Sequence, residues 1–265
     1  MSSQESKVVE YYRKLAESYD EGYAGDFWKQ IYDKITWRYI EPYLPKDGKV
    51  LDAGGGTGKW AIPIAKKGLT VVIYDISEDM LKVAIRKVKV EGLEERISTK
   101  RGDICKMDFP DESFDFVLAE GDPISYCSDP DKAISEIYRV LKPKCFTAAG
   151  VDNTYTAVRS AIIHHQDAAS AIKALREKRY YSEECDFYWW TFTPNDLKEL
   201  FEKHGFNVVK IVGKPVLNIY HHEKVQEMLK DSEKAGQILN LELALCEDPS
   251  IVGCAGHLHI VARKP

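Results

Sequence analysis

The chain has 265 residues, of which 44% are hydrophobic, and its 37 Lys and Arg against 42 Asp and Glu give a net charge of −5. This length and apolar content suffice to bury a substantial core in one large domain. No block of Lys or Arg is long enough to form a nucleic-acid-binding arm, so a nucleic-acid substrate is disfavoured. No apolar run approaches the roughly 18 residues of a membrane span, and residues 1–10 are too polar for a signal peptide.

The six cysteines show neither a C-x-x-C pair nor a zinc-ligand spacing with a histidine. They are Cys105, Cys127, Cys145, Cys185, Cys246 and Cys254. Such a pattern is typical of reduced thiols in an intracellular protein. We therefore expect a cytoplasmic protein without a bound metal.

Apolar side chains recur at helical spacing in two segments before the first predicted strand, residues 4–20 and 26–44. Two N-terminal helices are predicted. Their aromatic residues either pack the helices on a sheet or cover a ligand, and the spacing does not distinguish these roles.

Residues 50–60 read V-L-D-A-G-G-G-T-G-K-W, which predicts a strand, a tight turn and the start of a helix. Glycines at Gly54, Gly56 and Gly58 permit positive φ angles and a close approach of a ligand to the backbone. The helix that follows offers unpaired N–H groups to an anionic group. The stretch therefore predicts a binding site for a ligand that carries a carboxylate or a phosphate.

Two familiar glycine loops do not match this stretch. A dinucleotide fingerprint that starts at Gly54 needs a third glycine at position 59, which is Lys59. A phosphate-binding P-loop needs Ser or Thr after Gly-Lys, where this chain has Trp60, and a further glycine where it has Ala53.

A β-branched run at Thr70–Tyr74 predicts the second strand, which ends at Asp75. A carboxylate about 20 residues after a glycine turn is where an α/β nucleotide-binding site places its ribose acceptor. The alternative is an ordinary turn aspartate. Ser77 then caps a predicted helix that runs to Val90.

The remaining pattern continues the alternation of strands and helices. Strands are predicted at 97–100, 114–119, 145–151, 206–212 and 257–262, and helices at 129–141 and 157–178, after Thr193-Pro194 and near Glu223. Ligands in open α/β sheets bind at the carboxyl ends of strands, so the residues after the fourth strand, Glu120 to Asp122, should face the ligand.

These motifs, taken in order, resemble class I S-adenosylmethionine-dependent methyltransferases over about residues 45–150. The matching stretches are the (V/L)-L-D-x-G-x-G-x-G motif, the acid that ends the second strand, R-G-D-I after the third, F-P-D-E-S-F-D-F-V and E-I-Y-R-V-L-K-P. The opening Y-Y-R-K-L-A-E-S-Y-D is similar to that of ubiquinone/menaquinone-biosynthesis-type methyltransferases.

The resemblance implies a Rossmann-like, mostly parallel seven-stranded α/β sheet with an antiparallel last strand, flanked by helices. It implies one methyltransferase domain over residues 1–265. Its parts would be N-terminal helices (1–44), a cofactor-binding core (45–151), a lid insertion (152–191) and the C-terminal half of the sheet (192–265) with a second insertion (214–250).

The resemblance also implies residues that bind S-adenosylmethionine, which the reaction converts to S-adenosylhomocysteine. Together with the expectation that ligands bind at the carboxyl ends of the strands, it predicts a set of cofactor-binding residues. They are Tyr19, Asp52, Gly54, Gly56, Gly58, Asp75, Ile76, Asp103, Ile104, Glu120, Gly121 and Tyr126. Tyr11 is a second candidate beside Tyr19.

The predicted activity is methyl transfer to a small-molecule acceptor. A general base is needed only for an acidic acceptor group, and the candidates are Asp122 and the histidine pairs His164-His165 and His221-His222. Neighbouring residues point apart on a helix, so neither histidine pair chelates a metal by itself. Homodimer formation is left open.

Two alternatives remain. A non-catalytic protein could bind the cofactor without turnover. A nucleobase N-methyltransferase would carry Asp/Asn-Pro-Pro-aromatic after the fourth strand. Asp122-Pro123 matches its first half, whereas Ile124 and Ser125 break the second.

Overall fold

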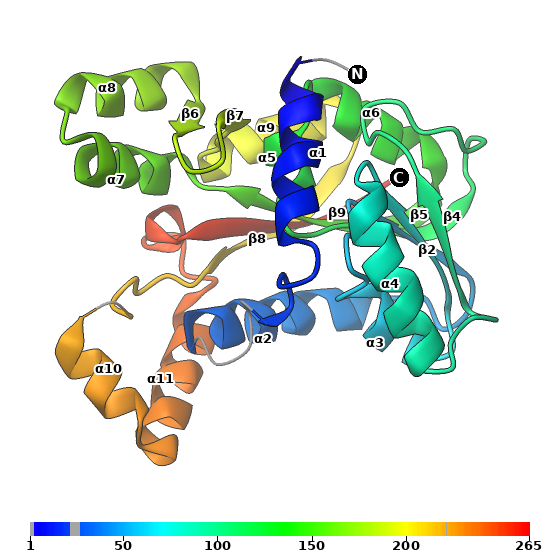
Figure 1. Cartoon of the computed structure of the whole chain (residues 1–265), viewed down its shortest axis with the longest axis horizontal. Helices are drawn as coiled ribbons and strands as arrows, with labels where there is room; N and C mark the ends of the chain where they lie inside the picture. Colours follow the sequence, from blue (N-terminus) through cyan, green and yellow to red (C-terminus); the bar gives the residue numbers. More distant parts are fainter. Residues whose placement is uncertain (1–2, 22–26, 221) are drawn as a thin grey trace.

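A computed structural model describes residues 3–21, 27–220 and 222–265. A seven-stranded sheet in the order β3-β2-β1-β4-β5-β9-β8 forms its centre, with helices on both faces (Figure 1). The strands are β1 (Lys49–Ala53), β2 (Thr70–Asp75), β3 (Ile97–Arg101), β4 (Phe114–Ala119), β5 (Leu141–Asp152), β8 (Asn207–Lys214) and β9 (His257–Arg263). β9 runs antiparallel to both of its neighbours, β5 and β8, and the other pairs in the sheet are parallel. The predicted mostly parallel sheet with an antiparallel last strand is confirmed.

The two central strands, β1 and β4, are buried on both faces, which explains their continuous apolar runs. One face packs against α2 (Phe27–Ile40), α3 (Ala61–Lys66), α4 (Glu78–Val90) and α11 (Ser232–Leu245). The other packs against α5 (Pro123–Tyr126), α6 (Pro130–Val140) and α9 (Pro194–Lys203). Two 3₁₀ turns in the described part of the chain are Glu41–Tyr43 and Val252–Cys254.

Side-chain caps set where several helices begin. The Ser77 hydroxyl accepts a hydrogen bond from the Met80 N–H at the start of α4, as predicted. Thr193 caps α9 with Pro194 at the first helical position, and Thr193 and Asp196 each accept the other's backbone N–H in a capping box.

The segment predicted as one helical stretch at 157–178 forms two helices, α7 (Thr154–His165) and α8 (Ala168–Glu177). Gln166, with a left-handed φ of 51°, ends α7, and the Asp167 carboxylate accepts backbone N–H groups at the start of α8. These local signals interrupt the apolar periodicity on which the single-helix prediction rested.

The aromatic stretch after α8 forms a hairpin of β6 (Arg179–Ser182) and β7 (Phe187–Trp190), which the sequence pattern did not predict. Tyr181 and Tyr188 are cross-strand partners with ring centroids 4.9 Å apart. The hairpin packs against α1 (Ser3–Leu15) and α5, so it lies over the carboxyl edge of the sheet.

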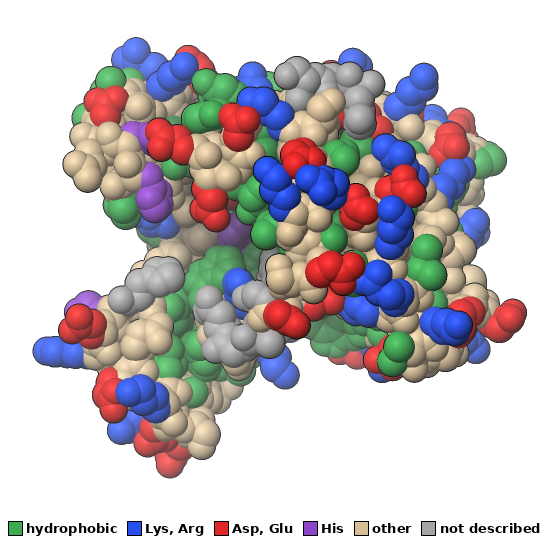
Figure 2. All heavy atoms as spheres, viewed as in Figure 1, with side chains coloured by type: hydrophobic (Ala, Val, Ile, Leu, Met, Phe, Trp, Pro, Cys, Tyr) green, Lys and Arg blue, Asp and Glu red, His purple; other side chains and the backbone are tan. Residues whose placement is uncertain are grey.

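Two helical projections extend from the same side of the molecule, α7 with α8 and α10 (Glu223–Leu229) with α11 (Figure 1). Figure 2 shows a hollow between them, with apolar side chains and a histidine at its back. The division of the chain into core, lid and insertion remains a prediction.

We predict that Thr193→Ala destabilises the protein by about 1 kcal/mol, because it removes the oxygen that caps α9. Urea unfolding monitored by circular dichroism measures the change. The exposed Ser232→Ala variant at the start of α11, where Asp231 supplies the cap, is the control. Equal stability of Thr193→Ala and the wild type would contradict the role of the cap.

Candidate functional site

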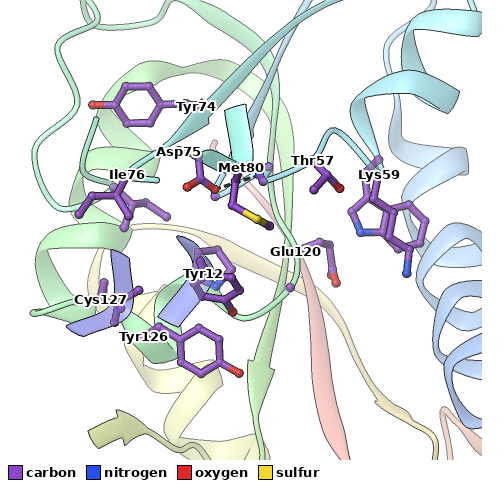
Figure 3. Close-up of a pocket in the computed structure, with 18 of the residues that line it drawn as sticks. Tyr12, Thr57, Lys59, Tyr74, Asp75, Ile76, Met80, Glu120, Tyr126 and Cys127 are labelled. Atoms are coloured by element: carbon purple, nitrogen blue, oxygen red, sulfur yellow. Dashed lines mark hydrogen bonds between the residues drawn. The ribbon is translucent and has the colours of Figure 1, made fainter. Parts of the chain in front are cut away.

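A pocket lies at the carboxyl edge of the parallel strands, where β1, β2 and β4 end and α1 passes over them (Figures 1 and 3). Ten predicted cofactor-binding residues line it: Tyr19, Gly54, Gly56, Asp75, Ile76, Asp103, Ile104, Glu120, Gly121 and Tyr126. Tertiary structure thus brings residues from five separate parts of the chain to one cavity.

The turn after β1 depends on its glycines. Gly54 and Gly56 have φ angles of 77° and 50°. A Cβ at Gly54 would lie 2.4 Å from the Cβ of Pro123, so the turn packs against the start of α5 without room for a side chain. The turn therefore presents bare backbone to the pocket.

Asp75 fixes this turn to the end of β2. Its Oδ2 accepts a hydrogen bond from the Gly56 N–H at 2.9 Å, and its Oδ1 accepts one from the Ser77 N–H at 2.8 Å. Burial raises the pKa of Asp75 to about 6, against the lowering effect of these two N–H groups. The carboxylate is half-buried and lines the pocket, where it can accept hydrogen bonds from a ligand.

The wall beside Asp75 is largely apolar. It contains Ile76, Met80, Ile104 and Cys127, with Asp103 at its edge. Figure 3 shows Tyr12 and Tyr126 across the cavity from Asp75 and Met80. A flat apolar group fits between such walls.

The structure does not bring Asp52 or Gly58 to the pocket surface. Asp52 is fully buried beneath the turn, and a Cβ at Gly55 would lie 2.7 Å from its carboxyl group. Burial, and secondarily the charge of Asp75, raises the pKa of Asp52 to about 8. A Cβ at Gly58 would come within 3.0 Å of the Ile73 side chain. In this structure both residues shape the turn from below.

A second pocket adjoins the first, and Tyr12, Tyr19, Gly121 and Tyr126 line both. Its other lining residues are Tyr11, Leu15, Ser18, Glu21, Lys29, Asp122, Ser182, Glu184, Cys185, Phe187 and Trp189. Asp122, a predicted base candidate, therefore faces the second pocket, and Tyr11 also lies there.

The histidines proposed as bases lie elsewhere. His164 and His165 are at the C-terminal end of α7 and line neither pocket, and His165 contacts Glu183 and the Tyr180 ring. His222 caps α10, also away from both pockets, and His221 lies outside the described residues.

Sequence reasoning missed a buried charge network behind Glu120. Lys214, at the end of β8, donates to Glu120 Oε2 at 2.5 Å and to the Thr36 hydroxyl at 3.1 Å, and neither charged side chain is exposed. His259 contacts Glu120 Oε1 through Nδ1. Burial opposes ionisation of Glu120, but Lys214 and His259 outweigh it and lower the pKa of Glu120 to about 2. Glu120 is thus an ionised group held at the pocket wall.

A second missed cluster contains Asp122, Asp152 and His257, whose candidate donor atoms lie within 4.8 Å of one another. His257 Nδ1 is 3.2 Å from Asp122 Oδ1 and 3.9 Å from Asp152 Oδ1. Among the described residues this is the one group of three such side chains close enough together to hold one cation. The only sequence signal was the position of His257 at the start of the last predicted strand.

Residues 50–144 match the model of a methyltransferase domain family. The chain is 24% identical to the tRNA 5-carboxymethoxyuridine methyltransferase of Escherichia coli K12 over 95% of each chain. It is 41% identical to the demethylmenaquinone methyltransferase of Bacteroides fragilis over 41% of this chain and 43% of that one. A methyltransferase structure from Methanosarcina mazei superposes with a TM-score of 0.60 at 20% identity, covering 85% of this chain and 96% of that one.

The sheet order and the glycine turn define a Rossmann-like methyltransferase fold. With the family match and the relatives, they identify the chain as a class I S-adenosylmethionine-dependent methyltransferase, as the sequence motifs predicted. Within the described part of the chain, no helix combines the length and apolar character needed to cross a membrane.

We predict that Lys214→Met destabilises the protein by about 3–5 kcal/mol, because it leaves the Glu120 carboxylate buried without its cation. Urea unfolding at pH 7 measures the loss. The double variant Glu120→Gln/Lys214→Met should recover much of it. A double variant less stable than Lys214→Met would show that the charge pair is not the cause.

The low pKa of Glu120 predicts that the protein loses stability at acidic pH. Its pKa falls from 4.5 to about 2 on folding, so its contribution is complete above pH 4.5 and is lost as the pH falls toward 2. The free energy of unfolding, measured between pH 6 and pH 2, should fall less steeply in Glu120→Gln than in the wild type. If the free energy of unfolding fell equally steeply with pH in Glu120→Gln and in the wild type, the low pKa of Glu120 would not be the cause.

Proposed function

We propose that this enzyme binds S-adenosylmethionine in the first pocket and transfers its methyl group to a small molecule in the second. We call these the donor pocket and the acceptor pocket. The main support for this proposal is that both pockets are lined by the same four residues, Tyr12, Tyr19, Gly121 and Tyr126. Two ligands can therefore meet at the boundary between the pockets.

The residues present suit the cofactor. The Asp75 carboxylate suits two ribose hydroxyls, the apolar wall of Ile76, Met80 and Ile104 suits a flat base, and the glycine turn leaves space for the amino-acid part. Glu120 lies on the same wall, and its carboxylate is held in place there by Lys214 and His259. When bound, S-adenosylmethionine supplies an activated methyl group on a sulfonium.

With the methyl group already activated, the protein mainly aligns the acceptor and excludes water. The cluster of aromatic rings between α1, α5 and β7 supplies an apolar wall for this. Tyr126 lies 5.7 Å from Phe187 and 5.9 Å from Trp189 between ring centroids, and Tyr12 lies 6.3 Å from Tyr126. An acceptor held among these rings would be shielded from bulk solvent.

A nucleoside in tRNA is a second candidate acceptor, because the E. coli relative named for that activity aligns over 95% of both chains. Against it stand the net charge of −5 and the mixture of acidic and basic side chains on the face in Figure 2, which shows no basic stripe. RNA binding that weakens steeply with salt would favour this candidate. Cofactor binding without formation of S-adenosylhomocysteine would favour the non-catalytic alternative.

We predict that Asp75→Ala weakens S-adenosylmethionine binding about tenfold or more, because it removes a charged acceptor of hydrogen bonds from the donor pocket. Isothermal titration calorimetry measures the dissociation constant. Asp79→Ala, an acidic residue in the first turn of α4, is the matched control and should bind as the wild type does. Full affinity in Asp75→Ala would refute the assignment of the donor pocket.

A further inference from the structure

The acceptor pocket combines aromatic and acidic side chains. Its described lining includes the rings of Tyr11, Tyr12, Tyr19, Tyr126, Phe187 and Trp189. Among the described lining residues, the charged ones are Glu21, Asp122 and Glu184 against Lys29, so acidic groups are in excess there. Ring faces and carboxylates both attract cations, and both disfavour an anionic ligand.

Asp122 is the acid best placed to bind such a cation. It is buried, follows directly after Gly121 at the boundary between the pockets, and has a left-handed φ of 65°. A non-glycine residue rarely adopts this conformation, which therefore costs about 1 kcal/mol or more. The backbone holds the carboxylate at this place in spite of that cost.

His257 keeps Asp122 and Asp152 together. Asp152 ends β5, Asp122 follows β4 as the residue before α5, and His257 faces both carboxylates from the start of β9. Burial lowers the pKa of His257, but the two carboxylates outweigh it and the net direction is upward, even with Lys214 on β8 opposing them. The Trp28 and Tyr32 rings of α2 also pack against His257. When His257 is protonated, its charge offsets the repulsion between the two carboxylates.

We propose that the acceptor is an amine, bound as an ammonium ion between the aromatic rings and Asp122, and that Asp122 takes the proton whose loss frees the nitrogen lone pair. This inference rests on the proposed function and names the substrate class for the same site. His257 and Asp152 are positioning residues, because they act through Asp122.

The chemistry balances. One N–H bond of the ammonium breaks, the proton moves to Asp122, and the electron pair stays on nitrogen. That pair forms the new N–C bond, while the electron pair of the C–S bond remains on sulfur. The proton then leaves Asp122 for solvent, so each turnover releases one proton and yields a methylated ammonium ion.

The first test compares the charge of the ligand at constant size. Ethylamine, benzylamine and tryptamine, each beside its alcohol and carboxylate analogue, are titrated into the protein saturated with S-adenosylhomocysteine. For at least one of the three side-chain sizes, the amine, bound as its ammonium form, should bind about tenfold more tightly than the alcohol. The carboxylate of that size should bind most weakly. Alcohols or carboxylates that bind as tightly as the amines in all three sizes, or no binding by any amine, would overturn the proposal.

Matched variants then locate the effect. Asp122→Asn should reduce the ammonium preference about tenfold, and His257→Gln should raise the KM for the amine more than it lowers kcat, since the unscreened carboxylates would share a proton. The surface pair Asp131 and His204 has the same chemistry outside both pockets, so Asp131→Asn and His204→Gln are the controls. An unchanged preference in Asp122→Asn would contradict the role of Asp122.

The experiments distinguish failure of the proposed methyl transfer from failure of the proposed amine acceptor. A protein that does not bind S-adenosylmethionine fails the proposed function before the acceptor is tested. A protein that binds S-adenosylmethionine but shows no ammonium preference retains the proposed function and loses only the amine. Mass spectrometry of the product identifies the methylated atom.

Discussion

The parallel pairing of β1 with β4 is the constraint on which the site depends. Because parallel strands end at one edge, this pairing places the glycine turn after β1 beside the residues that follow β4. The contact is close, since a side chain at Gly54 would overlap Pro123 at the start of α5. The donor pocket forms at this meeting point, and Asp75 at the end of β2 then fixes the turn through the Gly56 N–H. Strand order and backbone geometry thus position the pocket before any ligand is present.

The same edge holds several buried charged groups. The antiparallel β9 begins where β5 ends, so His257 and His259 lie among the carboxyl ends of their neighbours, and Lys214 ends β8 beside them. Burying such charges costs free energy unless each has a partner. Glu120 has Lys214 and His259, while Asp122 shares His257 with Asp152. The first group is sealed and stabilises the wall, and the second reaches the acceptor pocket through Asp122.

Fold and acceptor chemistry are separate questions in this protein. The relatives include enzymes named for a tRNA nucleoside and for a quinone precursor, and the fold likeness alone does not choose between acceptors. In the proposed function the choice depends on the side chains that line the second pocket, which come from α1 and the residues after it, α2, the segment from the end of β4 through α5, and the β6–β7 hairpin. Their aromatic and acidic character supports a cationic acceptor rather than an anionic one.

The sequence by itself predicted the strands of the sheet, the starts of α4, α6, α9 and α10, and several residues in local motifs that line the first pocket. Gly54, Gly56, Asp75 and the Ser77 cap act within a few residues of one another along the chain or at a fixed interval, so their spacing carries their role. The tertiary structure alone decided that Asp52 lies beneath the turn, that His164 lies away from both pockets, and that His257 joins Asp122. The last contact spans 135 residues and arises because β9 inserts antiparallel between β5 and β8. Alternation along β9 predicts a strand, but only the packing of the sheet fixes which strand ends lie beside it.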